Sequence, residues 1–217
     1  MLIDNDLARE ERKKKQQRKY IRYEREHSNS MWHTDYKQLD DGRWFIAYQD
    51  DASRFITGYG VFGHATTENA ITVLEEAVKN HGKPASILTD HGSQFYANES
   101  EVKRKGDSDY EKKLVEMEIN QILARVNHPQ TNGKLERLHG ELQRKLHLFE
   151  DIAGPPGSAC PVDGQKIEPD PVARFVRWYN HERPHESLND EDLETPAQAF
   201  TRKMPPQDVP VVEEKQT

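Results

Sequence analysis

Three segments near the start of the chain carry the hydrophobic pattern of β-strands. Apolar and polar residues alternate in MWHTDYKQL (31–39), and RWFIAYQD (43–50) follows after a tight Asp-Gly turn. SRFITGYGVFG (53–63) is rich in the aromatic and β-branched residues that favour strands. We predict that these three strands pair as an antiparallel meander.

The segment that follows, 65–82, has the apolar spacing of a helix. Thr66 or Thr67 can cap its start, and Gly82 can end it. Its predicted buried face consists of Ile71, Leu74 and Val78.

Two further short strands are predicted beyond this helix. PASILTD (84–90) is a buried strand that stops at Asp90, and ILARV (122–126) is the second. Between them, the polar residues 96–113 are expected to form an exposed loop, and 114–121 the end of a helix.

A leucine stripe predicts a long helix after this second strand. Thr131 or Asn132 can cap it. Its apolar positions are spaced by three, four and four residues: Leu135, Leu138, Leu142 and Leu146. Glu136 is about 100° from the first leucine around the axis, so it lies beside the buried stripe, and His139 is on its side.

The remaining residues predict a loop and two helices. The Pro/Gly-rich segment 153–171 is the loop, and helices are expected at 172–185 and 195–203. In chain order this gives three strands, helix, strand, helix, strand and helix. That order predicts an RNase H-like α/β fold, a mixed five-stranded sheet flanked by helices.

Composition is consistent with one polar domain and two tails. The chain has 217 residues, of which 32% are charged, and a mean hydropathy of −1.01. No apolar run approaches the roughly 18 residues of a membrane span, and no secretory signal begins the chain. A single cysteine fits a reducing compartment, so we expect a cytoplasmic protein. We expect a basic helical arm at 1–27, a core at 28–203 and a disordered acidic tail at 204–217.

Charge is distributed unevenly along the chain. The net charge of −7 disfavours a nucleic-acid partner, yet residues 9–25 carry nine Lys or Arg against three Glu. The stretch 9–26 is read as a polar helix in which Lys13, Lys14 and Lys15 contact the DNA backbone. The alternative for this arm is an ordinary solvated helix.

Three carboxylates can converge in such a fold. Asp35 is in the middle of a strand, Asp90 is at the carboxyl end of another, and Glu136 is on a helix that can cross the sheet nearby. Three acids without a basic partner repel one another, and two Mg²⁺ ions would relieve that repulsion. Mn²⁺ should substitute. The alternatives are a turn or cap residue for each Asp and a solvent-facing Glu, and spacing alone does not distinguish Asp35 from Asp50.

Several motifs resemble one known family. WHTDYKQL, LTDHGSQF and HPQTNGKLERLHGEL are similar to the three acidic motifs of DDE transposases and retroviral-type integrases. DDASRFITGYGVF and WYNHERPHESLN…TPAQAF resemble further stretches of insertion-sequence transposases of bacteria and archaea. The resemblance covers residues 28–203, and the order of all the motifs makes it specific.

The resemblance implies an enzyme that cleaves double-stranded DNA at transposon ends and transfers the strand to target DNA. Asp35, Asp90 and Glu136 would be the catalytic residues and would hold two Mg²⁺. A homodimer or higher homo-oligomer in a prokaryotic cytoplasm, associated with the nucleoid, is also implied. No membrane is involved.

Polar residues around the acids are candidate DNA contacts. Lys134, Arg137 and Arg144 can bind phosphates, and Gln94 follows Asp90 closely enough to approach the backbone. The alternative for the basic residues is an ordinary charged helix face. His139 is either a support for the site or polar surface. Four polar residues in the C-terminal part of the core are either structural or DNA-facing: Asn180, His181, Arg183 and His185.

The chain departs from the family pattern in two places. It has 45 residues between Asp90 and Glu136, where many members have 35, and only about 27 residues precede the core. That is too few for the usual helix-turn-helix domain. Two other functions are therefore weighed: a nuclease or resolvase that does not join strands, and a silent or domesticated remnant that binds DNA or protein.

Overall fold

Five strands form one sheet in the order β3-β2-β1-β4-β5. In the computed structural model, β1 (Trp32–Gln38) pairs antiparallel with β2 (Trp44–Asp50), and β2 pairs antiparallel with β3 (Ile56–Phe62). β4 (Ser86–Thr89) runs parallel to β1, and β5 (Asn120–Leu123) runs parallel to β4. The predicted meander and the two parallel additions are confirmed.

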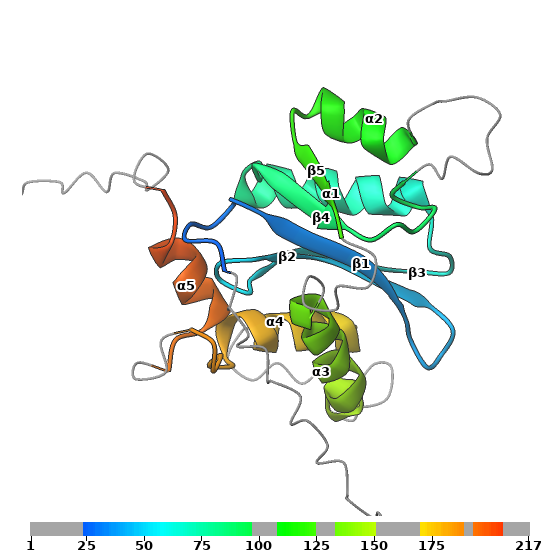
Figure 1. The fold of residues 1–217 in the computed structure, drawn as a ribbon. Coiled ribbons are helices and arrows are strands. Elements are labelled where there is room, and N and C mark those ends of the chain that lie inside the picture. Colours follow the sequence, from blue (N-terminus) through cyan, green and yellow to red (C-terminus); the bar gives the residue numbers. More distant parts are fainter. Residues whose placement is uncertain (1–23, 97–107, 125–132, 151–169, 189–192, 206–217) are drawn as a thin grey trace, which may run out of the picture.

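Helices cover both faces of this sheet (Figure 1). α1 (Thr67–His81) and α2 (Asp109–Glu116) pack on one face, while α3 (Gly133–Glu150) and α4 (Pro171–His181) pack on the other. α5 (Pro196–Arg202) packs against α4. Each face has its own hydrophobic core. The structure describes residues 24–96, 108–124, 133–150, 170–188 and 193–205.

The start and end of α1 follow the predicted chemistry. The Thr66 hydroxyl accepts a hydrogen bond from the backbone N–H of Asn69, and Gly82, at a φ of 84°, ends the helix. The buried face differs from the prediction, because it consists of Ala70, Val73, Leu74 and Ala77. Ile71 and Val78 lie at its margin.

Two glycines of β3 explain the rotation of α1. A Cβ built on Gly58 would lie 2.7 Å from the Cβ of Ala77, and one on Gly60 would lie 2.9 Å from a methyl group of Val73. The helix therefore approaches β3 so closely that its smaller side chains must face the strand. Val73 and Ala77 therefore face the strand, and Ile71 and Val78 lie at the margin.

The prediction of a loop for 96–113 is wrong for residues 109–113, which belong to α2. Ser108 and Glu111 form a capping box, in which each side chain accepts a hydrogen bond from the backbone of the other. Tyr110 and Leu114 are buried in the core below α1. β5 also begins two residues earlier than predicted, at Asn120.

The long helix agrees with its leucine stripe. Leu135, Leu138 and Leu142 are buried and Leu146 is partly buried, as predicted. The candidate caps Thr131 and Asn132 lie outside the described residues.

Helix boundaries near the two ends of the chain differ from the prediction. α4 ends at His181, four residues earlier than expected. Residues 24–26 are not helical, although the predicted basic helix included them. The rest of that helix, with Lys13, Lys14 and Lys15, and most of the predicted tail lie outside the described residues. Within the described part of the chain, no helix combines the length and apolarity that a membrane crossing requires.

Candidate active site

Asp35 and Asp90 lie on neighbouring parallel strands. The register pairs Trp32 with Ile87 and His33 with Leu88, so its continuation by two residues brings Asp35 opposite Asp90. Both side chains belong to the face covered by α3 and α4, because Asp35 is also paired with Ala47, a member of the core below those helices. The sheet therefore positions two carboxylates side by side where β4 ends.

The surroundings of Asp35 disfavour its charged form. Burial, and then the negative charge of Asp90, raise its pKa from 3.8 to about 6. The backbone N–H of Tyr36 donates a 2.7 Å hydrogen bond to the carboxylate and opposes this shift, while the charge of Glu136 adds to it. Two acids thus act electrostatically on a third from different elements.

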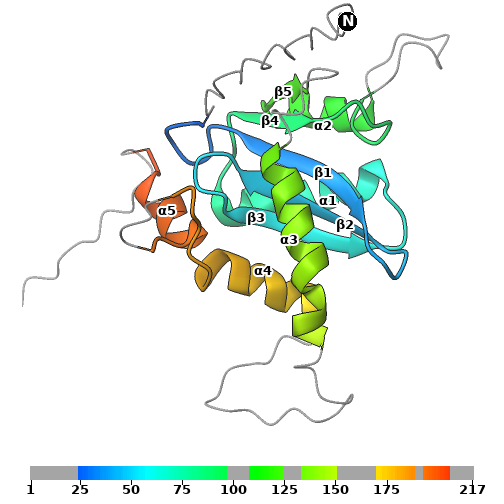
Figure 2. The same ribbon diagram turned by 60° about the horizontal axis from the view of Figure 1, so that its bottom comes forward.

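Glu136 reaches this region from α3. The helix crosses the sheet over β1 and β2, and its first turn lies near β1 and β4 (Figure 2). The buried leucines fix the rotation of the helix, and Glu136, next to Leu135, is exposed. Within the described ranges, however, no three Asp, Glu, His or Cys side chains are close enough to hold one metal ion. The three acids are therefore close enough to affect one another's charge, but they are not arranged as ligands of one metal ion.

The loop after Asp90 is held tightly to that residue. The backbone N–H of Gly92 donates a 2.8 Å hydrogen bond to the Asp90 carboxylate. A Cβ on Gly92 would lie 2.9 Å from Oδ1 of Asp90 and 2.6 Å from Oε1 of Gln94. Only glycine fits this position without moving a neighbour. Gln94, a predicted DNA contact, is thus next to Asp90 in space as well as in sequence.

A second buried carboxylate, Asp51, was not singled out from the sequence. Its side chain is 1% exposed and accepts hydrogen bonds from His33, from Lys134 and from the backbone N–H of Arg25. Burial would raise the pKa of Asp51, but the hydrogen bond and charge of His33 and the charge of Lys134 outweigh it and lower the pKa. The sequence showed only two aspartates at the end of a strand.

His139 is buried, which favours a supporting position over polar surface. It is 7% exposed and lies edge-on to Phe45 with ring centroids 6.1 Å apart. Burial lowers its pKa to about 4, and the charge of Lys37 acts in the same direction. Its Nε2 atom has no hydrogen-bond partner among the described residues.

The three basic residues predicted on this helix have different surroundings. Lys134 is engaged by Asp51, and Arg144 is bound to Glu141 at 2.8 Å. Arg137 is exposed and forms no ion pair with any described residue. DNA contact stays a prediction for all three, and among them Arg137 alone lacks an ion-pair partner within the described ranges.

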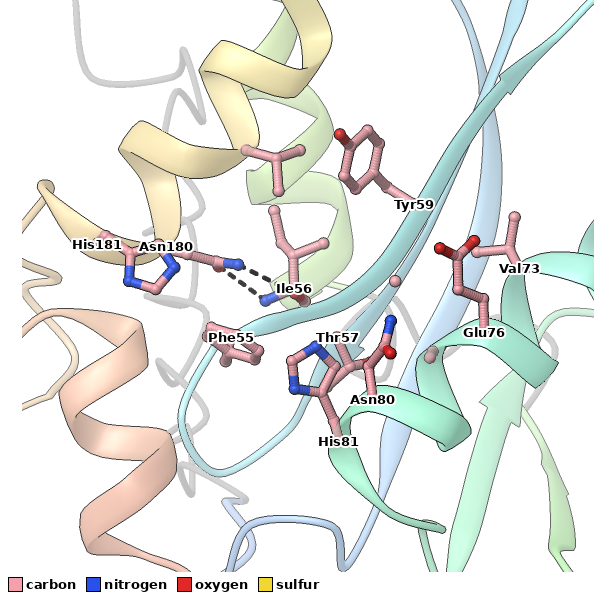
Figure 3. A pocket seen from close by; sticks show the side chains of 13 residues that line it. Phe55, Ile56, Thr57, Tyr59, Val73, Glu76, Asn80, His81, Asn180 and His181 are labelled. Carbon is pink, nitrogen blue, oxygen red and sulfur yellow. Dashed lines mark hydrogen bonds between the residues drawn. The ribbon is translucent and has the colours of Figure 1, made fainter. Parts of the chain in front are cut away.

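A separate groove of about 410 Å³ lies at the β3 edge of the sheet, between α1 and α4 (Figure 3). It is lined by residues such as Phe55, His81 and His181, and by none of the three acids. Asn180 lies along it and forms two hydrogen bonds with the backbone of Ile56. Asn180 therefore has a structural role here.

Comparison with known protein families agrees with these features. Residues 25–129 match the family model of the integrase core domain, a stretch that includes Asp35 and Asp90 and ends before Glu136. The expected resemblance to integrase and transposase cores is confirmed.

Two relatives support this match in sequence. The protein named "Putative integrase ORF3" of Spiroplasma virus SpV1-C74 is 27% identical over 159 residues, which are 70% of this chain and 41% of that protein. The transposase for insertion sequence IS1202 of Streptococcus pneumoniae is 34% identical over 101 residues, which are 46% of this chain and 22% of the transposase. The chain spans less than half the length of these relatives.

Solved structures establish the fold. A chain of the simian T-cell lymphotropic virus intasome, solved with PP2A regulatory subunit B56 gamma, superposes with a TM-score of 0.62 at 18% identity. The match covers 91% of this chain and 62% of that one. The HTLV-2 integrase catalytic core domain in complex with magnesium gives a TM-score of 0.55 at 16% identity, with 80% of this chain and 97% of the other covered. The predicted RNase H-like class is confirmed.

The chemistry of the acids fits a hard divalent cation. All three candidate ligands are carboxylates, and within the described residues none of them has an ion-pair partner. Mg²⁺ and Mn²⁺ prefer such oxygen ligands, and a cation would remove the repulsion that raises the pKa of Asp35.

Proposed function

We propose that this chain contains the catalytic core of a DDE-type transposase, which cleaves DNA and transfers the cut strand through Asp35, Asp90 and Glu136. The observation that carries the proposal is the adjacency of Asp35 and Asp90 across a parallel strand pair, with the charge of Glu136 acting on Asp35 from α3. The match to the integrase core domain supports this reaction class.

Each residue has a role that follows from its position. Asp35 and Asp90 would hold two divalent ions at the end of β4, and Glu136 would complete the ligand set from α3. Bound ions would supply an activated attacking oxygen and stabilise the leaving oxygen. Arg137, exposed beside Glu136, would contact a DNA phosphate.

The partners follow from this chemistry. We propose double-stranded DNA as the substrate, Mg²⁺ or Mn²⁺ as the cofactor, and a homodimer or higher homo-oligomer as the working form, because two DNA ends must be joined. The basic residues 9–25 would add backbone contacts, with a cytoplasmic, nucleoid-associated location.

The test is Mn²⁺-dependent nicking of supercoiled plasmid by the wild type and by Glu136→Gln. Glu150→Gln is a matched control, because Glu150 is exposed at the other end of the same helix. Nicking by the wild type and the control, but not by Glu136→Gln, would support the proposal. Equal nicking by all three would contradict the assignment of Glu136.

A second assay separates the two rival functions. Covalent joining of a labelled 3′-hydroxyl strand to plasmid would distinguish a transposase from a nuclease or resolvase. Binding of Mn²⁺ without nicking would favour a catalytically silent remnant.

A further inference from the structure

Asp51 connects β1 to α3 beside the candidate active site. Its carboxylate is 2.6 Å from Nε2 of His33 and is also bound by the ammonium of Lys134. His33 comes two residues before Asp35 on β1 and lies on the same face of the sheet. Lys134 comes two residues before Glu136, in the first turn of α3. One carboxylate therefore joins the two elements that carry two of the three acids.

The remainder of α3 is held in another way. Leu135, Leu138 and Leu142 pack into the core shared with α4, and they fix the axis of the helix and its rotation. The contact from Lys134 to Asp51 restrains the first turn, where helices fray most readily. Loss of this contact should loosen that turn and leave the helix docked.

The burial of Asp51 makes its ion pair with Lys134 costly to break. The carboxylate is 1% exposed, and the Lys134 side chain is 19% exposed. A buried carboxylate that loses a charged partner keeps its desolvation cost, so separating Lys134 from Asp51 is unfavourable and the first turn of α3 is held in place. The exposed pair of Lys83 and Glu118, 3.0 Å apart, carries no such constraint.

We propose that Asp51 is a positioning residue, which holds the first turn of α3 through Lys134 so that Glu136 stands opposite Asp35 and Asp90. This inference rests on the proposed function of these acids. It assigns Lys134 to the protein's own framework, and Asp51 touches neither DNA nor the reacting atoms.

The experiment compares Lys134→Met, Lys134→Arg and Asp51→Asn with the wild type. Lys83→Met is the matched control, because it removes a surface ion pair away from α3. Three quantities are measured: amide hydrogen exchange without metal of residues 137–139, whose N–H groups bind the carbonyls of the first turn, Mn²⁺ affinity by calorimetry, and plasmid nicking. Thermal unfolding shows that each variant is folded.

In Lys134→Met these amides should exchange at least tenfold faster, and the variant should bind Mn²⁺ several-fold more weakly and nick DNA more slowly. Lys134→Arg should restore much of each property, and Lys83→Met should match the wild type. Asp51→Asn should behave like Lys134→Met. If Lys134 contacted DNA directly, Asp51→Asn would instead leave nicking intact, and the inference would fail.

Unchanged amide exchange and Mn²⁺ affinity in Lys134→Met would also overturn the inference. Failure of the proposed function is a different result: the wild type would not nick DNA. In that case faster exchange and weaker Mn²⁺ binding in Lys134→Met would still support the positioning role.

Discussion

Asp35 on β1 stands across the parallel strand pair from Asp90, the residue that follows the last position of β4. Such a pair of carboxylates is unfavourable for the metal-free protein, because one sits in a partly buried position and the other adds negative charge to it. The same arrangement is favourable once a divalent cation binds. Stability and function should therefore oppose each other at this point of the fold.

Asp35→Asn should stabilise the metal-free protein at neutral pH. The carboxyl group has a pKa of about 6 in the folded protein against 3.8 ordinarily, so the folded state binds more protons between these values. As pH rises from about 4 to about 6, ionisation of Asp35 should lower the free energy of unfolding of the wild type. Above that range the total loss should be about 1–3 kcal/mol. Urea unfolding in EDTA at several pH values measures this difference.

The advantage of Asp35→Asn should be small at pH 4 and nearly complete at pH 7. Asp40→Asn is the control, because it removes an exposed carboxylate in the turn after β1. Added Mg²⁺ should stabilise the wild type more than Asp35→Asn. A variant no more stable than the wild type at pH 7 would show that burial of the Asp35 carboxylate beside Asp90 does not destabilise the metal-free protein.

Gly92→Ala should impair the site with little loss of stability. The new Cβ would lie 2.9 Å from Oδ1 of Asp90, so the carboxylate must rotate away. We expect plasmid nicking to fall about tenfold or more, because misplacement of a reacting group by about 1 Å costs up to two orders of magnitude. Gly63→Ala is the control, since a Cβ there meets nothing within 4 Å. Equal activity of both variants would show that Asp90 tolerates displacement.

Local patterns in the sequence predicted the five strands and the face of β1 on which Asp35 lies. Alternation along β1 assigned Asp35 to the face of His33, and the single buried strand before Asp90 assigned that residue to a strand end. The leucine stripe fixed which side of α3 carries Glu136. These features depend on spacing within one element, so they can be read from the chain alone.

The environment of Asp51 depends on residues far apart in sequence and could not be predicted. His33 precedes it by 18 residues and Lys134 follows it by 83. A strand that ends in two aspartates is ordinarily a strand that meets a turn, and β2 does end at Asp50. The close packing of Gly58 on Ala77 is also a contact between elements, which is why the predicted face of α1 was rotated.

Gly58→Ala should destabilise the fold through α1. The added methyl group would lie 2.7 Å from the Cβ of Ala77 and 3.2 Å from the carbonyl oxygen of Val73. Overpacking of this kind costs about 1–3 kcal/mol. The double variant Gly58→Ala with Ala77→Gly should recover part of the loss in urea unfolding. No recovery would mean that the carbonyl contact, and not the methyl group of Ala77, limits the approach of the helix.

Asn180→Ala should lower stability and leave the chemistry intact. The side-chain amide accepts a 2.9 Å hydrogen bond from the Ile56 N–H and donates one of 3.0 Å to the Ile56 carbonyl, as a neighbouring strand would (Figure 3). Its loss leaves both backbone groups of the edge strand without this partner, at a cost of about 2 kcal/mol. Asn80→Ala, an exposed residue that lines the same groove, should cost little. Nicking per folded molecule should equal that of the wild type, and a selective loss of nicking or DNA binding in Asn180→Ala would show that this residue faces DNA after all.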